Sequence, residues 1–161
     1  MKRIFYLLTV MTLFCAPPAF AQEWGEEHEL DFQLYNGYIV NKASAGLKSE
    51  KSYFVLADQE QFNKVFVKFG GYLPKLVLLP PDTFETKVVI ATIRAGNRRL
   101  YSDVKVVAKN RVLLVSYTAE DAGEGSFLTP LILTVDKGKY RAVIFTENGE
   151  RAGVVRLKQN L

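Results

Sequence analysis

Cysteine and histidine are almost absent: the 161 residues contain one of each. A serine triad and a cysteine dyad both need an imidazole base that the fold holds in place. The lone His28 lies among acidic residues in the polar stretch 22–30, which we expect to be a flexible leader. The sequence therefore predicts no catalytic residue, no enzyme activity and no cofactor. It also predicts no metal site, since zinc is held mainly by histidine and cysteine.

Long hydrophobic runs are also missing, and the longest, 4–14, is too short to span a bilayer. It follows two basic residues and precedes the small-residue exit Ala19-Phe20-Ala21, which is the pattern of a secretory signal peptide over residues 1–21. Cleavage near Ala21 would leave a periplasmic or secreted protein beginning at Gln22, without a membrane anchor. Cys15 lies inside this signal and follows two bulky residues, which disfavours lipidation, so the mature chain would contain no thiol.

The charge is nearly balanced, with 21 Lys and Arg against 17 Asp and Glu and a formal charge of +4. Removing the two basic residues of the signal leaves 19 against 17, or +2. Nucleic acids and anionic membranes require concentrated positive charge, so we expect neither as the main partner. Two local clusters lie beside turn residues and are expected at exposed loop ends: Arg94, Arg98 and Arg99, and Lys137, Lys139 and Arg141.

What the chain has in abundance is short β-branched and aromatic runs separated by Gly, Asn, Asp or Pro, which is typical of strands. The tight connections between them are predicted at Asn110, at Gly138 as a positive-φ residue, and at Asn148-Gly149. We therefore predict one mainly β domain over residues 31–161, an antiparallel small barrel or sandwich. The clearest strands are 87–94, 100–108, 111–118, 128–135, 140–146 and 154–158.

One segment, 58–66, predicts a short amphipathic helix after the second strand. Asp58 is a candidate N-cap, Gln61 follows three residues later, and apolar residues stand at 62, 65 and 66. The following segment 70–81 is apolar and interrupted by glycines and prolines. It is expected to be extended against the core, with an exposed partner-binding surface as the alternative.

Two loops were considered for chemistry. The loop 119–126 carries Glu120, Asp121 and Glu124 beside glycines, so calcium binding or a two-carboxylate hydrolase stays open as a minor alternative. The loop Gly96-Asn97-Arg98-Arg99 is not a phosphate loop, because a strand rather than a helix follows it.

The order of elements resembles the PrcB-like domain family over roughly residues 32–149. In this family a Thr-Gly-Gly-Tyr turn is the most recognisable element; Gly96 and Tyr101 match its outer positions, and Arg98-Arg99-Leu100 stands between them. The resemblance implies an exported bacterial β domain that stabilises a secreted protease complex without catalysing a reaction. It is carried by the segments 52–56, 58–66, 81–84, 87–94, 96–104, 129–133 and 140–145.

From these observations we expect an exported accessory module that binds or stabilises another exported protein. Only the resemblance implies that this partner is a protease. The alternative is a small β domain that carries or senses an apolar or sugar-like ligand in a cavity. The sequence leaves open the partner's identity and the oligomeric state. The expected partner-binding residues are Arg94, Gly96, Arg98, Arg99, Tyr101, Tyr72 and Leu73.

Overall fold

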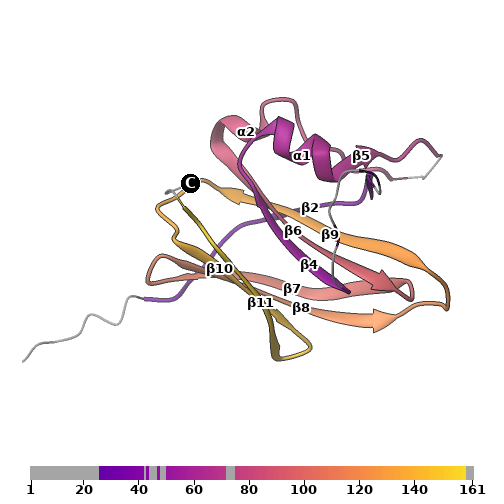
Figure 1. The fold of residues 1–161 in the computed structure, drawn as a ribbon. Helices are drawn as coiled ribbons and strands as arrows, with labels where there is room; N and C mark the ends of the chain where they lie inside the picture. Colours follow the sequence, from indigo (N-terminus) through magenta and orange to yellow (C-terminus); the bar gives the residue numbers. More distant parts are fainter. Residues whose placement is uncertain (1–25, 42, 44–46, 48–49, 72–74, 159–161) are drawn as a thin grey trace, which may run out of the picture.

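The computed structural model describes residues 26–41, 43, 47, 50–71 and 75–158, and this part of the chain is mainly β. Eleven strands form three sheets there, and two short helices lie beside one of them (Figure 1). The predicted fold class is confirmed at this level. None of the sheets built by these residues is closed, so the choice between barrel and sandwich stays a prediction. The predicted signal peptide, residues 1–21, lies outside the described residues.

The two larger sheets contain most of the strands. We call them the β7 sheet, with strand order β1-β7-β8-β10-β11, and the β6 sheet, with order β2-β9-β6-β4. The β7 sheet consists of β1 (His28–Glu29), β7 (Arg99–Lys109), β8 (Val112–Asp121), β10 (Ala142–Glu147) and β11 (Glu150–Arg156). The β6 sheet consists of β2 (Gln33–Tyr35), β4 (Lys51–Leu56), β6 (Lys87–Gly96) and β9 (Phe127–Asp136). The third sheet pairs β3 (Tyr38–Val40) with β5 (Phe66–Lys68).

The main core lies between the two larger sheets. In β8 buried and half-buried residues alternate, as expected for a strand with one face on a core. The central strand β6 is buried at seven consecutive positions, 88–94, because both of its faces are covered. One face packs against the β7 sheet, and the other packs on a second cluster that includes Phe62, Phe66 and Leu56.

Two of the three predicted turns have the expected backbone. Asn110 joins β7 to β8 with φ 50°, and Asn148-Gly149 joins β10 to β11 with φ 53° and 82°. The prediction for Gly138 is wrong: its φ is not positive, because β9 and β10 do not form a hairpin. The chain instead crosses from the β6 sheet to the β7 sheet, where β10 runs parallel to β8. A parallel pair needs no tight turn between its strands.

The predicted helix is confirmed as α1 (Gln59–Val65). The Asp58 carboxylate accepts hydrogen bonds from the Gln61 backbone N–H at 2.8 Å and from the Gln61 side chain at 2.7 Å, as expected for an N-cap. It follows the fourth strand rather than the second, because three short strands rather than one precede β4. A second short helix, α2 (Thr83–Thr86), was not predicted.

Part of the expected flexible leader forms the short strand β1. His28 and Glu29 pair with Ala108 and Val107 of β7, and the Leu30 N–H donates to the Val106 carbonyl at 2.9 Å. Leu30 and Phe32 then pack against the main core. Backbone pairing to an otherwise open strand edge explains why a polar, acidic segment forms a strand here.

Candidate functional site

The loop selected from the sequence connects β6 to β7. Its backbone is tied to the β8–β9 loop: the Arg98 N–H donates to the Gly123 carbonyl at 3.0 Å, and the Ala122 N–H donates to the Arg98 carbonyl at 2.8 Å. Gly96 ends β6 with φ +111°, a conformation that side chains rarely adopt. The exposed Arg98 side chain therefore projects from a loop whose backbone is held on both sides.

Arg94 was expected at an exposed loop end, and that expectation is wrong. Its residue exposure is 7%, because β6 is an inner strand and this side chain points toward the β7 sheet. Nη1 of Arg94 lies 3.5 Å from Oε1 of buried Glu147, and Nη2 lies 3.5 Å from a carboxylate oxygen of Glu50. The Lys51 ammonium reaches the same Glu147 oxygen at 3.1 Å. Arg94 thus belongs to a buried charge network rather than to the surface.

Arg99 and Tyr101 lie between that network and the surface. Arg99 pairs with Asp121 at 2.7 Å, and its backbone N–H donates to Oγ1 of Thr129 at 3.3 Å. The Tyr101 hydroxyl donates to the Thr129 carbonyl at 3.0 Å. Its ring meets the Tyr117 ring edge-on, with centroids 5.6 Å apart. These contacts fasten the beginning of β7 to β9 in the opposite sheet.

Tyr72 and Leu73 lie outside the described residues. The segment 75–79 is held by hydrogen bonds to the β2–β3 connection. The Asn36 side chain donates to the Lys75 carbonyl at 3.0 Å and accepts from the Val77 N–H at 2.8 Å. The segment also packs closely on Gly37, where an added Cβ would meet the Leu78 side chain and lie 3.1 Å from the Val77 carbonyl oxygen. The segment does not form a strand, and it leaves Val77 and Leu78 exposed. The exposure of these two side chains agrees in part with the alternative expectation of an exposed apolar surface.

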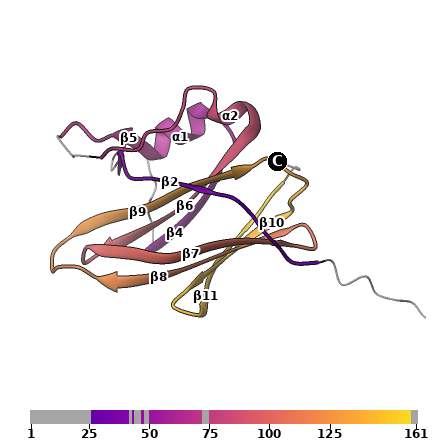
Figure 2. The same cartoon turned by 180° about the vertical axis from the view of Figure 1, so that it is seen from behind.

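Residues of these elements line an open groove of about 630 Å³ between the start of β7, the middle of β9 and the β2–β3 connection. Figure 2 shows the backbone course of β2, β7 and β9. Three of the exposed large apolar side chains line the groove: Leu34, Val77 and Leu100, the last with 57% exposure. Among the described residues, its lining includes two arginines and no acidic residue. The full lining is Leu34, Tyr35, Asn36, Tyr38, Val77, Arg98, Arg99, Leu100, Tyr101, Thr129, Pro130, Leu131 and Ile132.

The groove follows an incompletely paired strand edge. β2 pairs with β9 only at residues 132–134, whereas β9 begins at Phe127. Within the described chain no strand of the β6 sheet continues this pairing toward Phe127. Pro130, in the middle of this stretch, has no N–H to donate. Because β9 pairs with β6 along 127–136, only alternate backbone groups of 127–131 point to the open edge beside the groove, and Pro130 has no N–H to add.

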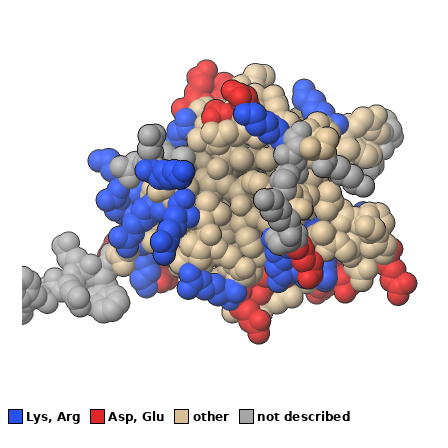
Figure 3. Space-filling model, viewed as in Figure 1, with Lys and Arg blue, Asp and Glu red and all other residues tan. Residues whose placement is uncertain are grey.

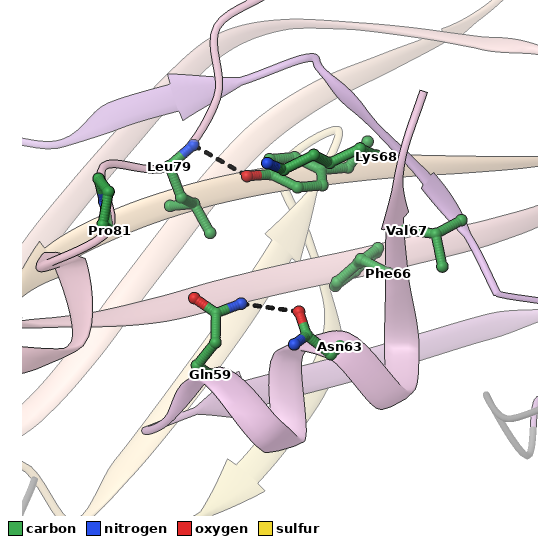
Figure 4. Close-up of a pocket in the computed structure, with 8 residues that line it drawn as sticks. Gln59, Asn63, Phe66, Val67, Lys68, Leu79 and Pro81 are labelled. Carbon is green, nitrogen blue, oxygen red and sulfur yellow. Dashed lines mark hydrogen bonds between the residues drawn. The ribbon is translucent and has the colours of Figure 1, made fainter. Parts of the chain in front are cut away.

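A second hollow, about 510 Å³, lies between α1 and the other side of the 75–81 segment (Figure 4). The Tyr38 hydroxyl accepts a hydrogen bond from the Leu79 N–H at 3.0 Å, and the Gln59 side chain donates to Asn63 at 2.7 Å. Tyr38 lines both hollows, while Val77 lines the groove and Leu79 and Pro81 line the second hollow. Among the residues that the structure describes, Lys68 is the charged residue in the lining of the second hollow.

Tyr53, Tyr101 and Tyr117 surround the Arg94–Glu147 pair between the sheets, and Tyr117 donates to Glu147 at 3.2 Å. Burial, followed by the nearby Glu147 charge, raises the pKa of Tyr53 to about 12. Burial also raises the pKa of Tyr101 and of Tyr117 above the ordinary value. The neutral phenol is thereby favoured in the folded state, which suits an interior position.

We expect the protein to lose stability as pH rises from about 10 through 12. The unfolded chain releases the Tyr53 proton near pH 10, while the folded chain retains it until about 12, so the folded state binds more protons in this window. Ultraviolet absorbance should show a delayed group of tyrosines that ionise together with unfolding. Ionisation of all tyrosines near their ordinary pKa in a folded protein would contradict the buried arrangement.

The carboxylates of the 119–126 loop do not gather into one site. β8 extends to Asp121, which pairs with Arg99, while Glu120 and Glu124 are exposed. Across residues 26–158, where they are described, no group of three or more His, Cys, Asp and Glu side chains is placed to hold a metal ion. Neither helix of this part is long and apolar enough to cross a bilayer.

Sequence reasoning found Arg98, Arg99 and Tyr101 but missed the opposite wall of the groove. Leu34 and Asn36 lie about sixty residues earlier. Leu34 is on the short strand β2, which carries little periodic signal, and Asn36 is in the connection that follows it. The Asn36-Gly37 pair was a usable turn signal. Glu147 was missed because a lone glutamate at a strand end is ordinarily exposed.

The fold and the groove define a mainly β domain with an open, apolar and cationic surface hollow. No protein-family model, curated protein or solved structure matches the chain. The resemblance to the PrcB-like domain family accordingly stays a prediction.

Proposed function

We propose that this protein is a non-catalytic, exported interaction module that holds a segment of another exported protein in the groove. The observation that carries the proposal is the lining itself, which combines exposed apolar side chains with two arginines and no acid. Apolar patches rimmed by polar groups are typical of protein-binding surfaces. Accessory binding is also what the resemblance to the PrcB-like family implies, with a protease as the suggested partner.

The occupant we propose is an extended peptide segment that carries an acidic group among apolar side chains. Leu34 and Leu100 would contact its apolar side chains, and the Arg98 guanidinium would pair with its carboxylate. Arg98 has no ion pair with any residue that the structure describes, whereas Arg99 is already paired with Asp121. Charge complementarity of this kind contributes both specificity and association rate.

The β9 edge supports an extended rather than a helical occupant. A segment lying along residues 127–131 could add backbone hydrogen bonds to the sheet, as in recognition by β-strand addition. Pro130 would leave one position without a donor, so the pairing is short and side-chain contacts must supply the rest. Because side-chain contacts supply most of the binding, the groove suits a specific partner rather than any strand that could pair with an open sheet edge.

Replacing Leu100 with aspartate, or Arg98 with glutamate, is expected to weaken partner capture at least about tenfold, since central interface positions carry most of the binding energy. The measurement is affinity capture of the tagged protein from its native host, followed by titration of the retained partner. Val154→Asp is the matched control for Leu100, because Val154 is exposed by 38% on β11 and lies outside the groove lining.

A partner that the groove variants and the control capture equally well would contradict the proposal. A small apolar ligand is the second candidate, because 630 Å³ falls within the size range of small-molecule pockets. Native mass spectrometry separates the two: a retained small molecule, lost in Leu100→Asp and with no protein captured, would favour the carrier.

A further inference from the structure

The fold collects basic residues that are far apart in the sequence at one end of the molecule, opposite the β8–β9 and β10–β11 turns. Ala142 of β10 pairs with both Val112 of β8 and Arg156 of β11. The Arg141 N–H donates to the Arg111 carbonyl at 2.8 Å, and the Leu157 N–H donates to the Arg141 carbonyl at 2.9 Å. We call the result the basic end: Arg111, Lys137, Lys139, Arg141, Arg156 and Lys158.

Figure 3 shows a group of blue Lys and Arg side chains on the left, where Figure 1 places the β7–β8 turn and the β9–β10 connection. The connection is anchored there by Arg111, whose Nε donates to the Lys139 carbonyl at 2.8 Å, and by Lys137, which donates to the Phe84 carbonyl at 2.7 Å. All six members of the basic end are exposed.

Acidic side chains near the basic end pair with lysines beside it. Lys87 pairs with Asp136 at 2.6 Å and Lys109 pairs with Glu27 at 2.7 Å. Lys139, Arg141 and Lys158 have no ion pair with an acidic side chain among the residues described. The nearly balanced net charge of the chain therefore conceals a strongly asymmetric distribution, which sequence analysis could not resolve.

We propose that the basic end is a peripheral contact for an anionic phospholipid surface. Neither hollow described above includes any of its six residues, so it offers a projecting end rather than a channel for a polymer strand. Single-stranded nucleic acid is usually gripped by exposed aromatic rings beside cations. The aromatic side chain nearest in sequence, Tyr140, is instead packed against the core. Several cations presented together suit a planar array of lipid phosphates.

The test is sedimentation of the purified protein with vesicles of phosphatidylcholine alone, or mixed in equal parts with phosphatidylglycerol. We expect binding to the mixed vesicles only, weakening as salt is added. The triple variant Lys139→Glu, Arg141→Glu, Lys158→Glu should lose at least about tenfold in partitioning. The control Lys68→Glu, Lys75→Glu, Arg151→Glu changes the net charge equally at exposed positions elsewhere and should retain binding.

Equal loss in both triple variants would overturn the proposal, since net charge alone would then explain binding. Absence of binding to the mixed vesicles at low salt would also overturn it. Binding to heparin without binding to vesicles would assign the end to a soluble polyanion, and full competition by inorganic phosphate would assign it to free phosphate. Lys158→Glu alone provides the measurement if the triple variant does not fold.

Discussion

Replacing Glu147 with leucine is expected to lower the free energy of unfolding by about 3–5 kcal/mol, because it leaves the buried Arg94 charge without its buried partner. Glu147 and Arg94 each have 7% exposure. The other carboxylate near Arg94 belongs to Glu50, whose side chain is 69% exposed and 3.5 Å away. Urea unfolding of the two proteins measures the difference.

The double variant Arg94→Met, Glu147→Leu is expected to recover most of this loss, since it removes both charges from the interior. Arg94→Met alone should cost less than Glu147→Leu alone, because Lys51 still reaches Glu147 at 3.1 Å. A loss below about 1 kcal/mol for Glu147→Leu would contradict the account of this network.

Truncating Phe62 to alanine is expected to cost about 3–5 kcal/mol. This α1 side chain is 1% exposed. Its ring centroid lies 4.9 Å from that of Tyr38, with the rings edge-on, and 5.1 Å from that of Phe66. The contact with Phe84 of α2, at 6.0 Å, joins the two helices. Loss of this ring would remove packing beneath the wall that Tyr38 forms between the two hollows.

The matched control is Asn63→Ala, at the next position of α1, where the side chain is exposed and bonded only to Gln59. Its expected change is below about 0.5 kcal/mol, as for most surface substitutions. Thermal unfolding and urea unfolding should agree on the difference between the two variants. Equal losses for Phe62→Ala and Asn63→Ala would show that the ring cluster is not a main support of the helix.

The strands from residue 87 onward could be predicted because they are long, rich in β-branched residues and bounded by turn residues. The helix 58–66 could be predicted because its cap and its apolar spacing coincide on Asp58 and Phe62. The strands before residue 50 could not, since two or three residues give no measurable periodicity. They form because β7, β9 and β5 offer edges for them to pair with.

Only the wall of the groove that β7 and the loop before it form could be predicted from the sequence. Arg98, Arg99 and Tyr101 form a local sequence cluster, and all three line the groove. Arg94 looked like a member of that cluster, but strand alternation and its position on an inner strand direct it into the core. The opposite wall depends on contacts across more than sixty residues, which no local pattern records.

Hydrogen exchange of the protein with and without its captured partner tests the central claim most directly. Partner binding should protect the backbone amides of 98–101 and those amides of 127–131 that point away from β6 to the open edge of β9. The amides of β11, at the far edge of the other sheet, should exchange as before. Protection confined to β11 or to the second hollow beside α1, with the groove unchanged, would contradict the proposed function.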